Sequence, residues 1–244
     1  MLSPLIAKLE QFARLSDEDR RVLQTLTSEP VHRYEPGTDI VREGDAPQTV
    51  RLVLSGWAYR YKQLPDGHRQ VVALFLPGDL FDYNVFVLSE MDHSIGALCA
   101  VTLVEIPPAA VEAMMAACPR VTRALWWESL VNAAVQREWM LNLGRRMAPE
   151  RLAHLFCEVF YRLRAIGLTQ GDSCEMPLTQ ADLADVIGMT SVHVNRVLQT
   201  LRRQKLVELR GRRLTIPDLP ALERAAQFNP NYLHLDHVGA RFDA

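Results

Sequence analysis

Hydrophobic and polar positions follow helical and strand periods in different parts of the chain. Over residues 4–26, hydrophobic residues recur near the helical period, which predicts two short helices, with Ser16 and Asp19 marking the start of the second. From about residue 31 to residue 106, short β-rich runs alternate with glycine turns such as "EPG", "REGD" and "PGD". This spacing predicts an antiparallel sandwich or barrel, and "LPDGHR" resembles the tip of a hairpin.

The longest helical segment, 120–146, contains no proline. It would extend roughly 40 Å, which is more than a small domain needs. Five of its residues have the 4-3-4-3 spacing of a coiled-coil seam with one basic interruption: Trp126, Leu130, Ala133, Arg137 and Met140. The adjacent tryptophans, Trp126 and Trp127, require cover on both sides. We therefore expect a homodimer with these five residues at its interface; the alternative is a helix that packs only on its own domain.

Residues 146–149 are predicted to be a hinge, because a residue before proline avoids helical geometry and Pro149 suits the first turn of a new helix. The next helix, 149–166, ends at Gly167, and "LTQGDSCEMP" is expected to be a polar loop. The expected organisation is a β-rich domain with N-terminal helices over 1–118, a dimerisation helix and hinge over 119–147, a second domain over 148–220, and a C-terminal helix and tail over 221–244.

Residues 178–203 divide into two short helices. The first begins at Thr179, which forms a capping pattern with Asp182, and it ends at Gly188. Thr190 caps the second, whose hydrophobic residues Val194, Val197, Leu198 and Leu201 are expected to face inward. Two helices joined by a short glycine turn indicate a helix-turn-helix.

Positive charge gathers directly after this motif. Between residues 191 and 213 lie seven basic side chains and one acidic one, a net charge of +6 in a chain of formal net charge −2. "LVELRGRRLTI" is typical of a hairpin wing, and such a patch favours DNA phosphates over an ordinary solvated face. The residues expected to bind DNA are Thr190, Ser191, Val192, His193, Asn195, Arg196, Gln199, Arg202, Arg203, Lys205, Arg210 and Arg212.

The remaining composition is that of an ordinary folded protein, with 48% hydrophobic residues and 23% charged residues. There is no run of about 18 apolar residues and no signal peptide, so we expect a cytoplasmic protein without a membrane partner. The four cysteines, at positions 99, 118, 157 and 174, form no ligand motif and are interpreted as structural thiols. No GxSxG, HExxH, P-loop or GxGxxG motif occurs, so we expect no enzyme activity.

Over roughly residues 10–220, the chain resembles transcription regulators of the Crp/Fnr family. The matching features are the glycine-punctuated β-rich region, "PGDLF", the long helix ending in "LGRR", and "LTQADLADVIGMTSVHVNRVLQTLRRQKLV". The resemblance implies an α+β fold: an antiparallel β-roll of the cyclic-nucleotide-binding type, a dimerisation helix and a C-terminal winged helix-turn-helix. It also implies promoter binding and contact with RNA polymerase.

Departures from the family pattern bear on the effector. The positions corresponding to the family's effector pocket are Asp82, Tyr83, His93, Ser94, Trp139 and Met140. His93-Ser94 falls where the resemblance implies an Arg-Ser pair for the cyclic phosphate, and Asp92 beside it disfavours an anion. We therefore predict that cAMP is not the effector, although a protonated His93 would partly replace the arginine.

Other cofactors of the family also have no clear ligands here. No cysteine precedes Cys99, so an N-terminal iron–sulfur cluster is not expected, and His68 and His93 lack an obvious second axial haem ligand. In the tail, His234, Asp236 and His237 offer metal-ligating groups, but packing through Tyr232 and Leu233 is favoured. No cofactor or metal is predicted; the alternative is a regulator gated by another small molecule or by haem.

Within the second helix of the motif, the resemblance places a glutamate and an arginine against base edges. Arg196 occupies the arginine position, and its guanidinium matches guanine O6 and N7. The glutamate position is Val192, which favours contact with a thymine methyl group instead. The half-site is therefore expected to keep a guanine and to differ near Val192.

Overall fold

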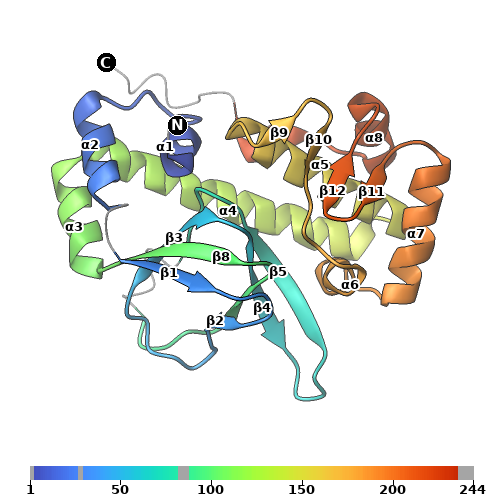
Figure 1. Cartoon of the computed structure of the whole chain (residues 1–244), viewed down its shortest axis with the longest axis horizontal. Helices are drawn as coiled ribbons and strands as arrows, with labels where there is room; N and C mark the ends of the chain where they lie inside the picture. The colour runs from blue at the N-terminus through green and yellow to red at the C-terminus, as the bar shows by residue number, and fades with distance from the viewer. Residues whose placement is uncertain (1–2, 27–29, 82–87, 236–244) are drawn as a thin grey trace. The chain divides into compact units, whose positions relative to one another are not determined.

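A computed structural model of the chain describes residues 3–26, 30–81 and 88–235 (Figure 1). Contacts divide it into two units. The first, here called the β-roll unit, contains the described parts of residues 1–62, 73–132 and 234–244. The second, the winged-helix unit, contains residues 63–72 and 133–233. The division falls inside the long helix rather than at either of its ends.

Among the described residues, eight strands of the N-terminal half form two four-stranded sheets. The first has the order β1 (Val31–Tyr34), β8 (Val101–Ile106), β3 (Val50–Ser55), β6 (Leu80–Phe81). The second has the order β2 (Asp39–Val41), β7 (Ser94–Ala97), β4 (Ala58–Gln63), β5 (Arg69–Phe75). The strand pairs with a described register are antiparallel, as predicted; Val31 lies opposite Val104, for example.

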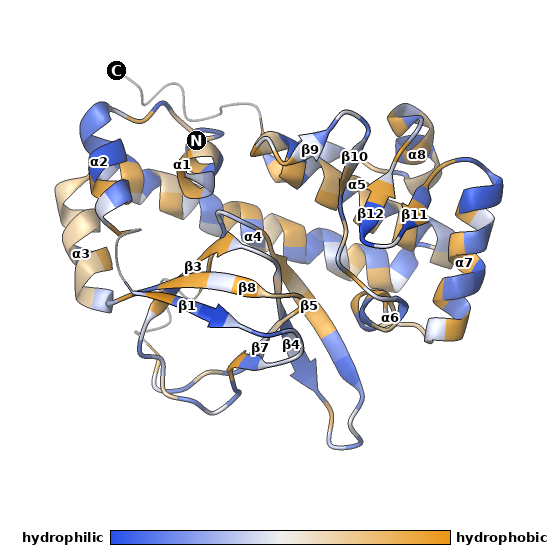
Figure 2. Ribbon diagram, viewed as in Figure 1, coloured by the Kyte–Doolittle hydropathy of each residue, from blue (hydrophilic) through white to orange (hydrophobic). Residues whose placement is uncertain are grey.

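The strand period of two builds two cores in the β-roll unit. Along β8, Val101 and Leu103 belong to a core that also contains Phe75, Phe81 and other residues of both sheets. The opposite face of β8 carries Val104 and Ile106, which belong to a second core shared with the N-terminal helices. Figure 2 shows hydrophobic residues concentrated along β3 and β8, the strands that contribute to both cores.

Residues 96–106 form two strands that are broken at 98–100. The backbone N–H of Leu98 donates to Trp57 O at 2.9 Å, and that of Trp57 donates to Cys99 Sγ at 3.3 Å. A Cβ atom on Gly56 would lie 2.2 Å from Ala100 O, so only glycine allows the two turns to approach each other.

The helices of this unit are α1 (Pro4–Leu9), α2 (Asp17–Leu26), α3 (Pro108–Ala117) and the start of α4 (Pro119–Arg145). The predicted cap of α2 is confirmed, because Ser16 Oγ accepts from the Asp19 N–H at 3.1 Å and Asp19 Oδ2 accepts from the Ser16 N–H at 2.9 Å. Helix α3 was not predicted. It is short and begins with Pro108 at its first turn, and two of its side chains, Val111 and Met114, are buried.

Three charged side chains meet inside the β-roll unit. Lys8 Nζ lies 2.5 Å from Asp79 Oδ1 and 2.5 Å from Glu128 Oε1, and Glu128 is 1% exposed. Burial lowers the pKa of Lys8, but the attraction of both carboxylates outweighs it and holds this pKa above its usual value. Burial raises the pKa of Glu128, against the opposing effect of Lys8. The trio ties α1, the turn before β6 and α4 together.

The winged-helix unit contains α5 (Ala148–Ala165), α6 (Gln180–Ile187), α7 (Ser191–Arg203), α8 (Leu219–Ala226) and a 3-10 helix, η2 (Pro230–Leu233). Its sheet has the order β11 (Glu208–Arg210), β12 (Arg213–Thr215), β10 (Ser173–Glu175), β9 (Thr169–Gln170). The prediction of a polar loop at "LTQGDSCEMP" is therefore wrong. Cys174, which is buried, pairs with Leu214, 40 residues later, and nothing local in the sequence indicates that partner.

Polar groups are also buried beneath η2. Glu158 is fully buried, and its carboxylate accepts from Trp139 Nε1 at 3.0 Å and from the Tyr232 hydroxyl at 2.9 Å. His154 is fully buried between these helices, with its ring 5.9 Å from that of Tyr232 and 5.0 Å from that of Phe228. The predicted packing of the tail through Tyr232 and Leu233 is confirmed, since both side chains are buried.

Two further findings concern the thiols and the membrane. All four cysteines are buried and free, and burial raises the pKa of the Cys174 thiol to about 12, as it also raises the pKa of Cys157. This placement agrees with structural thiols. No helix in the described part of the chain has the length and apolar character needed to cross a membrane.

Candidate nucleic-acid interface

The first helix of the motif, α6, is closed at both ends by interactions that the sequence predicts. The Thr179 hydroxyl accepts from the Asp182 N–H at 3.1 Å, and the Asp182 carboxylate accepts from the Thr179 N–H at 2.9 Å. Gly188 ends the helix in the left-handed conformation, with φ of +65°. Three residues, 188–190, then connect α6 to α7.

Side chains from elsewhere in the same unit satisfy the last carbonyl groups of α6. Gln70 Nε2 lies 2.8 Å from Asp185 O and 3.0 Å from Val186 O, and Arg151 Nη1 donates to Ile187 O at 2.7 Å. Arg69 forms an ion pair with the Asp185 carboxylate at 2.6 Å. These contacts hold the turn of the motif, and sequence reasoning missed them because their partners are more than 30 residues away.

The second helix, α7, has one buried face and one exposed face. Thr190 caps it, accepting from the His193 N–H at 3.3 Å. The four hydrophobic residues predicted to face inward are each 5% exposed or less: Val194, Val197, Leu198 and Leu201. Figure 2 shows hydrophilic and hydrophobic residues alternating along the helix. The local pattern therefore produces the amphipathic helix that was predicted.

The polar face of α7 carries the residues predicted to contact bases. Asn195 is half-buried, and the others are exposed: Thr190, Ser191, Val192, His193, Arg196 and Gln199. Val192 is 64% exposed. The Arg196 guanidinium makes no hydrogen bond or ion pair with any residue that the structure describes. Both side chains are thus available to an external ligand.

The predicted phosphate-binding residues are all exposed, but they differ in how far the protein already uses them. Arg202 Nη2 donates to Leu209 O at 2.5 Å and thereby holds β11 against α7. Arg203 donates to the Thr200 hydroxyl at 3.2 Å, and Arg210 lies 3.4 Å from Glu208. For Lys205 and Arg212, no side-chain partner occurs among the described residues. Arg210 and Arg212 flank Gly211 at the tip of the β11–β12 hairpin, which is the predicted wing.

A chain of three side-chain amides links α6 to α7. Asn195 Nδ2 donates to Gln180 Oε1 at 3.1 Å, and Gln199 Nε2 donates to Asn195 Oδ1 at 2.9 Å. We call Gln180, Asn195 and Gln199 the amide ladder. Gln180 was missed by sequence reasoning; its position directly after the cap of α6 was the available signal.

The predicted effector residues are distributed over both units. His93 and Ser94 lie in the β-roll unit and are each 9% exposed, whereas Asp82 and Tyr83 lie outside the described residues. Trp139 and Met140 belong to the winged-helix unit, where Trp139 is bound to Glu158 and Met140 is 65% exposed. The assignment of these residues to one pocket stays a prediction.

His93 is already engaged within the β-roll unit. Its Nδ1 lies 2.6 Å from Asp92 Oδ1, and this hydrogen bond lowers the pKa of Asp92. Ser94 Oγ accepts from the Glu43 N–H at 3.0 Å.

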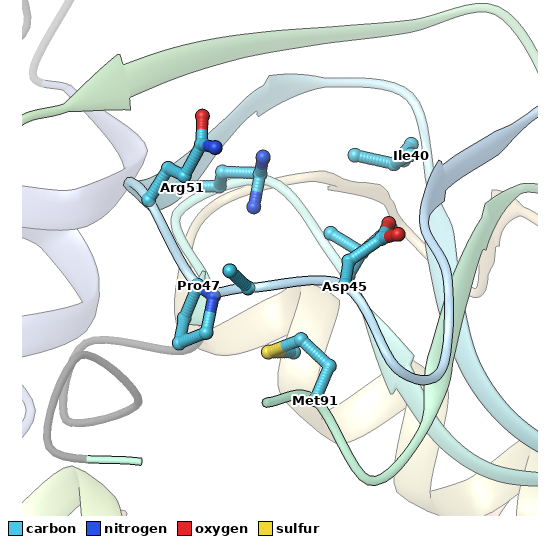
Figure 3. Close-up of a pocket in the computed structure, with 8 residues that line it drawn as sticks. Ile40, Asp45, Pro47, Arg51 and Met91 are labelled. Carbon is cyan, nitrogen blue, oxygen red and sulfur yellow. The ribbon is translucent and has the colours of Figure 1, made fainter. Parts of the chain in front are cut away.

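A separate cavity of about 230 Å³ is lined by residues that include Ile40, Asp45, Arg51 and Met91 (Figure 3). Of the predicted effector residues that the structure describes, none lines it. Arg51, its cationic residue, donates to Glu105 at 3.1 Å. The cavity therefore offers no uncompensated cation for an anionic ligand.

The five residues predicted at a dimer interface are all exposed along α4: Trp126, Leu130, Ala133, Arg137 and Met140. Trp126 is 61% exposed, whereas Trp127 is 8% exposed and stacks on Phe12 with ring centroids 5.6 Å apart. The two tryptophans thus face different surroundings, and only one is covered by its own unit.

The metal ligands considered in the tail cannot be compared, because Asp236 and His237 lie outside the described residues. Within the described ranges, no group of three or more His, Cys, Asp and Glu side chains is arranged to hold a metal ion.

Comparisons with known proteins agree with this geometry. Residues 150–225 match the Crp-like helix-turn-helix domain, and residues 31–118 match the cyclic nucleotide-binding domain. The transcriptional activator protein FnrL of Cereibacter sphaeroides is 30% identical over 202 residues, which cover 81% of each chain. The nitrogen fixation regulation protein FixK of Bradyrhizobium diazoefficiens is 29% identical over 177 residues, which cover 72% of this chain and 73% of FixK.

Among solved structures, FixK2 from Bradyrhizobium japonicum superposes with a TM-score of 0.71 at 25% identity, covering 80% of this chain and 96% of that one. The CRP-family regulator TTHB099 from Thermus thermophilus has a TM-score of 0.63 at 23% identity, covering 81% and 97%. The α+β fold predicted from the sequence is confirmed.

Proposed function

The chain belongs to the Crp/Fnr family of transcription regulators, and on that premise we propose that it binds a near-palindromic DNA site as a homodimer, without cAMP. The observation that carries the proposal is the exposed face of α7, where Arg196 has no described protein partner and lies one helical turn from the exposed Val192. A recognition helix reads base edges with side chains of this kind, placed near its N-terminus.

Base reading is assigned to Arg196 and Val192. A guanidinium binds guanine O6 and N7 through two parallel hydrogen bonds, and a valine contacts a thymine methyl group. The half-site should therefore contain a guanine and, near it, a thymine. Ser191 and His193 lie on the first turn of the same exposed helix, where they are placed to contact bases or phosphates.

Phosphate binding is assigned to Arg202, Arg203, Lys205, Arg210 and Arg212. Lys205 and Arg212 are the strongest members of this set, because neither has a described side-chain partner to give up. Each cation that neutralises a phosphate releases a counterion, so affinity should fall steeply with salt.

A second copy of the chain is proposed to cover the exposed face of α4. Trp126 and Leu130 are 61% and 68% exposed, and large apolar side chains gathered in this way on a surface indicate an interface. Leu130→Asp should shift the protein from dimer to monomer in analytical ultracentrifugation, because the carboxylate would be buried against an apolar partner. Leu168→Asp, at an exposed leucine outside α4, is the matched control and should leave the dimer intact. A variant at position 130 that sediments like the original protein would contradict this interface.

The proposal excludes cAMP as effector because the position of the phosphate-binding arginine is occupied by His93, which is held by Asp92. Even a protonated His93 paired with that carboxylate would leave no net positive charge for a cyclic phosphate. No iron–sulfur cluster or haem is proposed. A different small effector in the β-roll unit is the alternative, and two features favour keeping it: the family's sensor fold and the cavity beside Arg51.

RNA polymerase is proposed as a further partner because family membership implies it, and the name of FnrL favours activation. Transcription in vitro from a template carrying the selected site would decide between activation and repression.

The deciding experiment is selection of bound duplexes from a random pool by the full-length protein, with and without cAMP. We expect one enriched near-palindrome, with half-site centres about 10 bp apart, in both conditions. Enrichment that requires cAMP would contradict the proposal for the effector. Failure to enrich any duplex at low salt would contradict the proposal as a whole.

A further inference from the structure

The amide ladder gives one residue of the recognition helix a defined orientation. A side-chain amide in solvent rotates freely and presents either its carbonyl oxygen or its NH2 group. Asn195 is half-buried and uses both ends of its amide inside the protein, one toward Gln180 and one toward Gln199. Its neighbours on either side are therefore oriented. Asn195 keeps one N–H and one lone pair, but it is half-buried, whereas Gln199 is exposed.

The direction of the ladder determines what each end presents. Gln180 accepts from Asn195, so its NH2 group keeps two donors that point away from the ladder. Gln180 lies in the first turn of α6, where the positive end of the helix dipole already favours an anion. These donors suit a DNA phosphate. The reverse ladder would aim lone pairs at such a phosphate, so a phosphate bound here would favour the direction observed.

At the other end, Gln199 donates one N–H to Asn195 and retains a carbonyl oxygen and a second N–H. That pair of groups matches adenine, whose N6 amino group donates and whose N7 accepts in the major groove. Gln199 is exposed and lies three residues after Arg196, about 4.5 Å along the helix, a rise between one and two base-pair steps of about 3.4 Å.

We infer that Gln199 reads an adenine next to the guanine read by Arg196, and that Asn195 is the positioning residue that orients Gln199 for this contact. The inference rests on the proposed function, since it requires α7 to lie in the major groove. It assigns Asn195 to orientation rather than to base contact, and it adds Gln180 to the phosphate-binding residues.

The test repeats the selection with full-length variants at these positions. Gln199→Ala should lower the preference for adenine at one position of the selected site by about 5- to 100-fold. The preference for guanine at the adjacent position should stay unchanged. Asn195→Ala should weaken the preference for adenine at the same position. The double variant of Asn195 and Gln199 should lose no more of this preference than Gln199→Ala alone. Gln180→Ala should weaken binding to all sequences by about 2- to 10-fold. Because it releases one end of the Asn195 amide, it should also weaken the preference for adenine, but no more than Asn195→Ala does. Gln204→Ala, at an exposed glutamine outside the ladder, is the matched control and should change neither quantity.

Two results would overturn the inference while leaving the proposed function intact. Adenine preference that survives Gln199→Ala would show that Gln199 reads no base. If Asn195→Ala changed the base preference at a position different from the one that Gln199→Ala changes, Asn195 itself would contact DNA. If the original protein enriches no duplex, the proposed function fails first, and that outcome is distinguishable from both.

Discussion

The β-roll unit and the winged-helix unit use their charged side chains in opposite ways. In the β-roll unit, Lys8 is enclosed by Asp79 and Glu128, and His93 is held by Asp92. In the winged-helix unit, Arg196, Lys205 and Arg212 are exposed on α7 and near the wing without a described side-chain partner. The first arrangement maintains a fold, whereas the second leaves charge available to a ligand.

This difference shows why family membership implies different things for the two units. An exposed cation without a described side-chain partner, such as Arg196 or Arg212, stabilises no contact within the fold, so its presence in a patch of net charge +6 is best explained by an external anion. A buried ion pair needs no external ligand to account for its charges, because each partner neutralises the other and removing either one leaves an uncompensated charge. DNA binding by the winged-helix unit is therefore better supported than nucleotide binding by the β-roll unit.

The largest expected effect is on the trio in the β-roll unit. Lys8→Met should lower the free energy of unfolding by about 3–5 kcal/mol, because Asp79 and Glu128 would remain buried without their cation. Denaturant titration of the full chain would measure it. Arg21→Ala breaks the exposed pair with Glu18 and should cost no more than about 1 kcal/mol. If both variants lost the same free energy of unfolding, the trio would contribute no more to stability than an exposed ion pair does.

The next effect concerns pH and the interior of the winged-helix unit. Burial lowers the pKa of His154 to about 3, below its ordinary value of 6.5. Between these values the unfolded chain binds a proton that the folded chain does not, so stability falls as the pH falls through this window. The loss should approach roughly 1.4 kcal/mol per pH unit.

His154→Phe should reduce this slope between pH 6 and pH 4, because phenylalanine keeps the ring contacts with Phe228 and Tyr232 but does not titrate. Thermal unfolding at several pH values would measure it. His68→Ala, at an exposed histidine, should keep the original slope. An unchanged slope in His154→Phe would show that another group controls the acid lability.

The smallest expected effect distinguishes a base-reading residue from a phosphate-binding residue in the proposed DNA interface. Arg196→Ala should cost about 1–3 kcal/mol on the selected site and relax the choice at one base pair. Arg212→Ala should instead weaken binding to all duplexes alike and reduce the salt slope by about 1. Fluorescence anisotropy with specific and random duplexes would separate the two. Equal loss on both duplexes for Arg196→Ala would contradict base reading.

The helix-turn-helix could be predicted closely because its determinants are local. The caps at Thr179 and Thr190 and the turn at Gly188 act within three or four residues, and so do the helical spacings that they delimit. The strands β9 and β10 could not be predicted, because β10 pairs with β12, about 40 residues later. Helix α3 was missed for a related reason: its short pattern becomes informative only against the core that Val111 and Met114 complete.

The candidate site shows the same division. The outward face of α7 follows from periodicity alone, so the exposed positions of Val192, Arg196 and Gln199 were predicted correctly. The hydrogen bonds of Arg202 with the Leu209 carbonyl and of Asn195 with Gln180 could not be predicted, since each joins groups on different elements.

The amino-acid sequence by itself determined the strands and helices with local signals, the cluster of positive charge and the amphipathic faces of α4 and α7. Only the tertiary structure decided which polar groups pair within the protein, as Lys8 does, and which stay exposed to an external ligand, as Arg196 does. The physical reason is that caps and periodicity act over a few residues, whereas neutralising a buried charge requires partners that folding brings from distant positions.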